Sequence, residues 1–309
     1  MSIMSQFIST GVFAATFRMM TTVGFAALAT LMATKSGIMH MGQEGLMLLC
    51  ALAGVAGEYF SGSVLIGILL AIVVGIGFNL LYALFVTTCR GDHVVVGVGI
   101  NFFASGITAL MIMAFWKKAG QSDTVEGIAK LSIPLFKKIP VLDAVLGSQN
   151  VLFYILILAV VVLWILIYKT PFGLQMRVAG ELPLAVACTG KDVNKIRYSC
   201  MAIGGILFAL AGANISLGQT KAFSKGMISG RGFVALAMCM LGRNHPVYAF
   251  FACMMYGYTE ALQLRLQGQG ASNELLQCIP YVFAIVVIAI SGSLRNPAAL
   301  GKPYPEDAN

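Results

Sequence analysis

Long runs of apolar residues, separated by shorter polar stretches, dominate the chain. A membrane-spanning helix needs about 20 predominantly apolar residues, and about nine segments approach that length or contribute part of it. Continuous runs indicate helices, because a membrane barrel would show short strands of alternating residues. The predicted segments are Phe7–Thr34, Gly37–Tyr59, Val64–Thr88, Val94–Trp116, Val151–Tyr168, Tyr198–Leu217, Gly232–Leu241, Val247–Leu266 and Leu276–Ile290.

Two of these segments depart from a simple crossing. Glycine and polar residues interrupt Gly37–Tyr59, and Gly232–Leu241 is too short to span a bilayer unaided. We therefore expect an all-α, polytopic transmembrane fold in which one or two helices are broken or short. Residues 1–309 form a single transmembrane domain in this prediction.

Composition supports a membrane protein. Hydrophobic residues make up 59% of the 309 positions and charged residues only 10%, whereas a soluble domain carries about 25% charged residues. The mean hydropathy is +0.87. The 34 glycines are typical of helices whose backbones approach closely in lipid. A soluble chain of this length would need a charged surface that this composition does not supply.

The net charge of +8 does not indicate a nucleic-acid partner. The 20 basic residues are spread among short segments between the apolar runs, and they form no basic stripe interleaved with aromatic residues. Cytosolic lysine and arginine beside anionic lipid explain the excess.

Three polar stretches set the expected topology. If residues 169–197 are cytosolic and the sides alternate, residues 117–149 are extracytoplasmic and the tail 295–309 is cytosolic. Lysine and arginine divide almost evenly between the two sides under this scheme, so they do not settle the side of the N-terminus. The tail is rich in proline, glycine and charge, which predicts an irregular extension.

The stretch Gly37–Gly45 has the most unusual local sequence. It places His40, Gln43 and Glu44 between glycines at the head of an apolar run. A carboxylate at the bilayer centre costs about 2.5–3.5 kcal/mol on insertion scales. Broken helices in transporters line cavities with such groups. The pattern favours a discontinuous helix beside a translocation path, with an interfacial helix start as the alternative.

Two asparagines lie inside other apolar runs. Asn101 is followed by Phe102, and an amide beside an aromatic ring can contact a planar polar solute. Asn101, Phe102 and Asn214 are therefore further candidates for the translocation path. Interhelical hydrogen bonding is the other interpretation of the two asparagines.

A third polar feature lies in the penultimate apolar run. Glu260, Gln263 and Gln267 are spaced i, i+3 and i+7, which puts them on one helix face. That face either lines a cavity or lies near the membrane surface, and the sequence leaves both open.

Catalytic motifs are missing from the sequence. The pattern GxxxxGK[ST] does not occur, so the chain does not bind ATP by that route. The three histidines and seven cysteines show neither a catalytic arrangement nor metal-ligand spacing. We expect a protein that is not an enzyme and that carries no cofactor, no metal and no catalytic residues.

One polar segment carries a family resemblance. Residues 169–190 resemble the cytosolic coupling segment of bacterial ABC importer permeases, in the branch that serves simple sugars, nucleosides and branched-chain amino acids. The resemblance is closest to nucleoside-type permeases, in particular the shorter of their two paired subunits. The matching residues are Thr170, Phe172, Gly173, Arg177, Gly180, Glu181, Pro183, Ala185, Ala187 and Gly190.

Other blocks match the same branch. Gly37–Gly45 resembles its G-x-x-N-x-G-x-E-G pattern, and Gly230–Pro246 and the Leu300–Tyr304 tail match further along. His40 stands where the family usually has asparagine, which puts the solute in doubt rather than the family.

The resemblance implies partners and a location. A second, related permease, two ATP-binding subunits and an extracytoplasmic solute-binding lipoprotein would complete an importer in a bacterial cell membrane. The coupling segment would dock on the ATP-binding subunits, and Glu181 would pair with a basic residue across that interface.

Several functional alternatives remain open at this point. Nucleosides lead as the solute, with riboflavin, simple sugars and branched-chain amino acids behind. An ATP-independent secondary transporter would show internal repeats and buried ionisable relays, but no convincing second copy of the first half is visible. A membrane enzyme would need a catalytic cluster.

Overall fold

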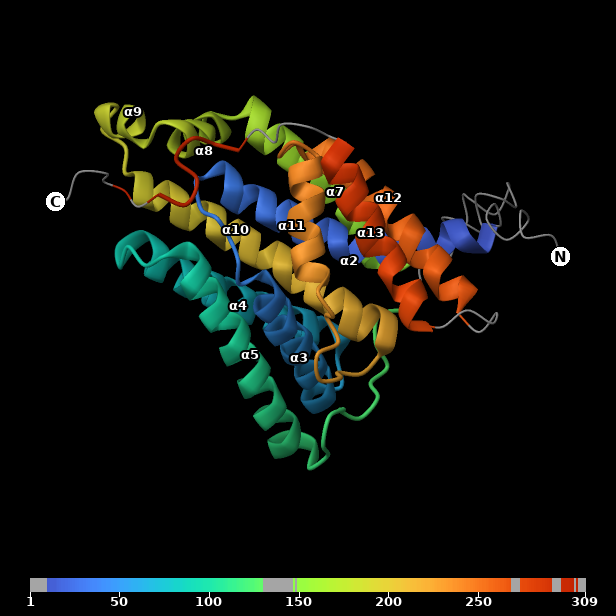
Figure 1. The fold of residues 1–309 in the computed structure, drawn as a ribbon. Coiled ribbons are helices and arrows are strands. Elements are labelled where there is room, and N and C mark those ends of the chain that lie inside the picture. The colour runs from blue at the N-terminus through green and yellow to red at the C-terminus, as the bar shows by residue number, and fades with distance from the viewer. Residues whose placement is uncertain are drawn as a thin grey trace.

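The computed structural model describes residues 10–129, 147, 149–267, 273–290, 296–302 and 304. Helices account for most of these residues (Figure 1). Gln121 and Ser224 form an isolated antiparallel β-bridge. The elements are α2 (Thr10–Lys35), α3 (Gln43–Ser61), α4 (Val64–Ala83), η1 (Leu84–Thr88), α5 (His93–Trp116), α7 (Val151–Lys169), α8 (Pro171–Glu181), α9 (Pro183–Cys188), α10 (Val193–Ala213), η3 (Asn214–Thr220), α11 (Arg231–Leu241), α12 (Pro246–Leu266) and α13 (Asn273–Ile290).

The all-α polytopic prediction is confirmed, but the count of nine segments is not exact. Six helices of the described chain are long and apolar enough to cross a membrane: α2, α3, α4 with η1, α5, α7, and α10 with η3. Helix α11 has only 11 residues, and Glu260, Gln263 and Arg265 make α12 more polar than the six. The long, strongly apolar runs of the sequence therefore predicted the membrane-spanning helices most reliably.

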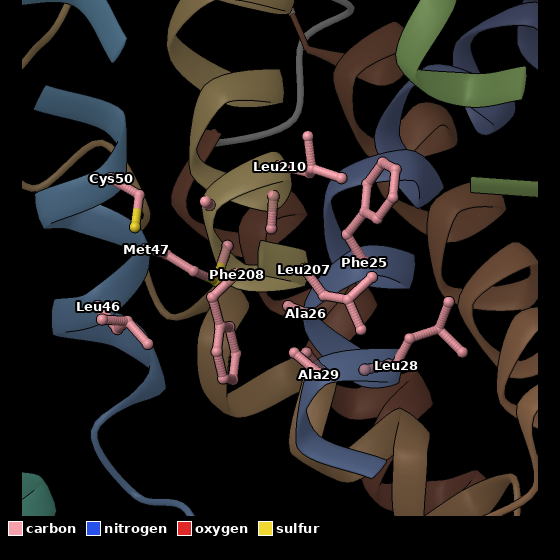
Figure 2. Close-up of a cluster of buried hydrophobic side chains, with 14 of the residues drawn as sticks. Phe25, Ala26, Leu28, Ala29, Leu46, Met47, Cys50, Leu207, Phe208 and Leu210 are labelled. Carbon is pink, nitrogen blue, oxygen red and sulfur yellow. The ribbon is translucent and has the colours of Figure 1, made fainter. Parts of the chain in front are cut away.

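Burial divides the long helices into a centre and a periphery. In the most apolar stretch of α2, α3 and α10, between 72% and 78% of residues are buried, against 22% to 33% for α4, α5 and α7. Phe25 and Leu28 of α2, Leu46 of α3, and Leu207 and Phe208 of α10 meet in the core (Figure 2). The peripheral helices expose apolar side chains, as helices facing lipid must.

Glycine brings the central helices together. A Cβ atom at Gly212 of α10 would lie 2.5 Å from the carbonyl oxygen of Met47 on α3. At Gly205 it would lie 2.7 Å from the carbonyl oxygen of Gly75 on α4. Only glycine permits these approaches, as expected for packing through small residues in lipid.

The two ends of α10 lie near different polar segments. At its N-terminal end, the Ala299 amide donates to Gly180 of α8 at 3.0 Å, and the Gly301 amide donates to Gly37 at 3.0 Å. At its other end, the Ile128 amide donates to Leu217 at 2.9 Å. The predicted coupling segment and the tail therefore lie together, and the described part of 117–149 lies at the opposite end (Figure 1).

Candidate functional site

The chain between α2 and α3 is not helical. Helix α2 ends at Lys35 and α3 begins only at Gln43, so the backbone groups between them need other partners. Asn101 of α5 supplies two bonds: its Oδ1 accepts from the Gly45 amide at 2.7 Å, and its Nδ2 donates to the Met41 carbonyl at 3.0 Å. Asn101 therefore holds the break in place.

Glu44 connects this break to the short helix α11. Its Oε1 accepts from the Gly230 amide at 2.7 Å and its Oε2 from the Gly232 amide at 2.9 Å. These amides belong to the first turn of α11, where the helix dipole favours a carboxylate. A Cβ atom at Gly232 would lie 2.8 Å from the Glu44 backbone nitrogen. The N-termini of α3 and α11 thus meet through Glu44.

His40 and Gln43 are packed between helices. His40 is 1% exposed; its Nε2 lies 2.7 Å from Asn79 Oδ1, and its ring stacks on Tyr82 with centroids 4.3 Å apart. Gln43 is fully buried, and its Oε1 accepts from the Thr30 hydroxyl at 2.7 Å. Both side chains contribute interhelical hydrogen bonds.

The remaining candidates for the path lie apart from this break. Asn214 is buried at the start of η3, and its Nδ2 donates to the Thr22 hydroxyl at 2.8 Å. Phe102 is 76% exposed on α5. The structure thus brings His40, Gln43, Glu44 and Asn101 around one break and leaves Asn214 and Phe102 elsewhere.

The polar face of α12 lines a cavity, in agreement with one of the two interpretations. Glu260, Gln263 and Gln267 lie along a cavity of about 290 Å³ with Arg231 and Tyr281. Arg231 Nη2 donates to Glu260 Oε1 at 2.6 Å. Sequence reasoning did not select Arg231 as a site residue, although it stands in the Gly230–Pro246 block.

The predicted coupling segment forms two short helices. Thr170 caps α8, because its hydroxyl accepts from the Gly173 amide at 3.1 Å, and Pro171 occupies the first turn. Arg177 lies over the Tyr168 ring at 5.2 Å. Phe172 packs on the core beneath.

Helix α9 begins at the buried Pro183. Ala185 and Ala187 are half-buried along it. The segment ends at the exposed Gly190, whose φ of +73° favours glycine.

Glu181 holds the C-terminal tail. Its Oε2 accepts from the Ala298 amide at 3.1 Å, beside the bond between Gly180 and Ala299. The sequence predicts that Glu181 pairs with a basic residue of a partner. The structure shows an additional contact, to the Ala298 amide of the same chain. Leu182 and Leu184 are 57% and 47% exposed beside it and form an apolar surface where α8 meets α9.

The described residues contain no group of three histidine, cysteine, aspartate or glutamate side chains placed to hold a metal ion. The features that distinguish this molecule are the meeting of two helix N-termini inside an apolar bundle and a helical segment that presents exposed leucines at one end.

A family model agrees with this architecture. The model described as branched-chain amino acid transport system / permease component matches residues 12–291. The chain belongs to this family. It is a multi-pass membrane permease, and the predicted membrane location is confirmed.

Individual relatives in the family are transporters of nucleosides. The guanosine ABC transporter permease protein NupQ of Bacillus subtilis (strain 168) is 32% identical over 296 residues, which are 90% of this chain and 91% of that protein. The nucleoside ABC transporter permease protein NupC of Lactococcus lactis subsp. cremoris (strain MG1363) is 30% identical, over 91% of this chain and 92% of that protein. These permeases confirm the resemblance to the nucleoside type.

A second guanosine permease is also similar. NupP of Bacillus subtilis (strain 168) is 26% identical to this chain, over 95% of the chain and 85% of that protein. The glucose ABC transporter permease protein TsgB13 of Haloferax volcanii is 25% identical, over 84% of this chain and 72% of that protein.

Proposed function

We propose that this chain is the permease subunit of an ABC importer that carries nucleosides across the membrane. The observation that carries the proposal is the similarity to NupQ and NupC along nine-tenths of the chain. The chain forms the path, and separate ATP-binding subunits supply the energy.

The α8–α9 segment is the surface on which an ATP-binding subunit docks. Two features support this role: the segment projects from one end of the bundle (Figure 1), and it exposes Leu174, Leu182 and Leu184. Exposed apolar side chains on a polar, water-facing segment mark a protein interface. The residues that shape this surface are those matched above, from Thr170 to Gly190.

Movement of α8–α9 would reach the translocation path through α2. A Cβ atom at Gly180 would meet the backbone at Lys35 and Gly37, so α8 lies directly on the end of α2. Gly37 opens the non-helical stretch that holds His40, Gln43 and Glu44. Closure of the ATP-binding subunits would therefore shift the break between α2 and α3, and with it the access of the path.

A second permease completes the path. NupP and NupQ are both similar to this chain, which supports a heterodimer of related permeases. An extracytoplasmic solute-binding lipoprotein delivers the solute to the end opposite α8–α9. Riboflavin, simple sugars and branched-chain amino acids are the alternative solutes, and the similarity to a glucose permease supports sugars among them.

Gentle purification of the tagged chain from its own host tests the assembly. We expect the second permease and two copies of ATP-binding subunit to copurify, and mass spectrometry identifies them. Recovery of this chain alone, at the mass of a self-associated permease, would contradict the proposal.

A further inference from the structure

A polar cavity lies between α11, α12 and α13, which follow one another in the C-terminal part of the bundle (Figure 1). Its volume is about 290 Å³, at the lower end of the range for ligand sites. Such a volume accommodates part of a small solute rather than a large ligand. The polar side chains along it are Ser229, Arg231, Glu260, Gln263, Gln267 and Tyr281.

Glu260 is the central group of this cavity. It is 6% exposed, and one oxygen, Oε1, accepts from Arg231 Nε at 3.0 Å and Nη2 at 2.6 Å. The other oxygen, Oε2, is buried and has no hydrogen-bond partner within the described part of the chain. A buried carboxylate oxygen without a donor is costly, so a ligand that brings a hydrogen-bond donor to this oxygen would be stabilised.

The charges around the cavity select against anions. Arg231 lies between Glu260, which it binds directly, and Glu44, whose oxygens accept from the Gly230 and Gly232 amides on either side of it. One carboxylate thus binds the Arg231 guanidinium, and a second binds the backbone amides on either side of this residue. A phosphate group would meet an excess of negative charge there, whereas neutral hydroxyl groups would donate to it favourably.

We propose that this cavity binds the vicinal hydroxyl groups of a neutral, ribose-bearing solute as it passes through the permease. One hydroxyl donates to Glu260 Oε2. The side-chain amide of Gln263, which is 9% exposed, both donates and accepts and bonds the neighbouring hydroxyl. A carboxylate on a ribose hydroxyl is an established mode of nucleoside recognition in proteins.

An aromatic wall accompanies these groups. Tyr281 is 43% exposed and its hydroxyl is fixed by a bond to the Ser229 carbonyl at 3.0 Å. Its ring therefore offers a rigid face at the cavity for the planar base of the solute. This inference rests on the proposed function and assigns the solute-contacting groups within it: neutral nucleosides are accepted and nucleotides are not.

The test uses the complete importer in proteoliposomes, with its binding protein saturated by each solute so that the membrane step is compared. Uptake rates are measured for guanosine and 2′,3′-dideoxyguanosine. We expect Glu260→Gln to lower guanosine uptake about tenfold, the effect of a lost hydrogen bond to a charged group, and to change dideoxyguanosine uptake less than about twofold. Gln263→Met is expected to lower the ratio of the guanosine uptake rate to the dideoxyguanosine uptake rate by a smaller factor.

Glu58→Gln is the matched control. Glu58 is also a buried carboxylate with one bonded oxygen, which accepts from the Gly127 amide at 2.7 Å, and one unpartnered oxygen in the described chain, but it does not line this cavity. We expect it to leave the ratio of the two uptake rates unchanged.

Equal loss of both solutes in Glu260→Gln and Gln263→Met, or an unchanged ratio in both, would overturn the inference. Guanosine uptake by the unaltered importer separates this result from the proposed function. If the unaltered importer carries no nucleoside at all, the proposed function fails first.

Discussion

At the scale of single residues, polar side chains in this bundle form hydrogen bonds with backbone groups that have no partner within a helix. Asn101 bonds both sides of the break before α3, and Glu44 bonds the first amides of α11. In lipid, no water replaces such partners. The asparagine that the sequence offered as a candidate for solute contact is therefore bound by its own chain.

Replacing Asn101 with leucine tests this role. Asn101→Leu leaves the Gly45 amide and the Met41 carbonyl without partners, and each buried unpaired group costs about 1–3 kcal/mol. We expect a lower melting temperature in detergent. Phe102→Leu, at an exposed position next to it, is expected to melt like the unaltered protein. Equal melting temperatures for all three proteins would contradict the role.

A substitution at Gly232 tests the contact between α3 and α11. A methyl group there would lie 2.8 Å from the Glu44 nitrogen, and overpacking of this kind costs about 1–3 kcal/mol. We expect Gly232→Ala to lower the melting temperature and transport together. Gly77→Ala on α4, where a Cβ atom meets nothing within 4 Å, is the control. A variant at Gly232 that behaves like the control would show that α3 and α11 do not pack as described.

At the scale of elements, α8 and α9 stand out because this pair of short helices lies at one end of the bundle (Figure 1). Thr170 and Pro171 start α8, and Pro183 starts α9. The tail of the chain binds back onto α8 through Gly180 and Glu181. These contacts fix the segment on the bundle and leave its leucines exposed.

Glu181 is expected to matter for coupling rather than for insertion. Glu181→Ala removes the acceptor of the Ala298 amide and loosens the tail on α8. We expect ATP hydrolysis in the assembled importer to respond several-fold less to solute-loaded binding protein, with normal amounts of permease in the membrane. Lys191→Ala, further along the same segment, serves as the control. Unchanged solute uptake by the Glu181→Ala importer would contradict the coupling role of Glu181.

A separate prediction concerns the exposed Leu182 and Leu184 as part of the docking surface. The double change Leu182→Ser and Leu184→Ser removes apolar surface without touching the core, so the melting temperature of the permease stays the same. We expect loss of copurifying ATP-binding subunit, measured by quantitative mass spectrometry. Cys188→Ser, exposed at the end of the same helix, should retain it. Full retention in the double variant would place the docking surface elsewhere.

At the scale of the whole molecule, the apolar pattern predicted most of the fold. Runs such as Val151–Tyr168 became helices almost residue for residue, because length and hydropathy suffice to specify a crossing. Three of the nine segments fall short of a clear span. Helix α11 has 11 residues, the apolar part of α13 is only Cys278–Val287, and α12 carries buried polar groups such as Glu260, which pairs with Arg231 of α11. Sequence hydropathy does not register a partner that lies on another helix.

The site was less predictable for a related reason. Glycine brackets around His40 and Glu44 predicted either a broken helix or a helix start, and α3 begins at Gln43. The partners of these side chains lie far along the chain, as Gly230 and Gly232 do for Glu44. Arg231 was missed because its ion pair with Glu260 spans two helices and follows no local spacing. Local pattern therefore located the break but not the groups around the cavity.

The whole-molecule claim is that this permease carries nucleosides with energy from ATP. The most direct measurement is uptake of radiolabelled guanosine into proteoliposomes that contain the chain, its partner permease and the ATP-binding subunits, with binding protein outside and ATP within. We predict accumulation that requires both ATP and the binding protein. Accumulation without ATP, or by this chain alone, would contradict the account.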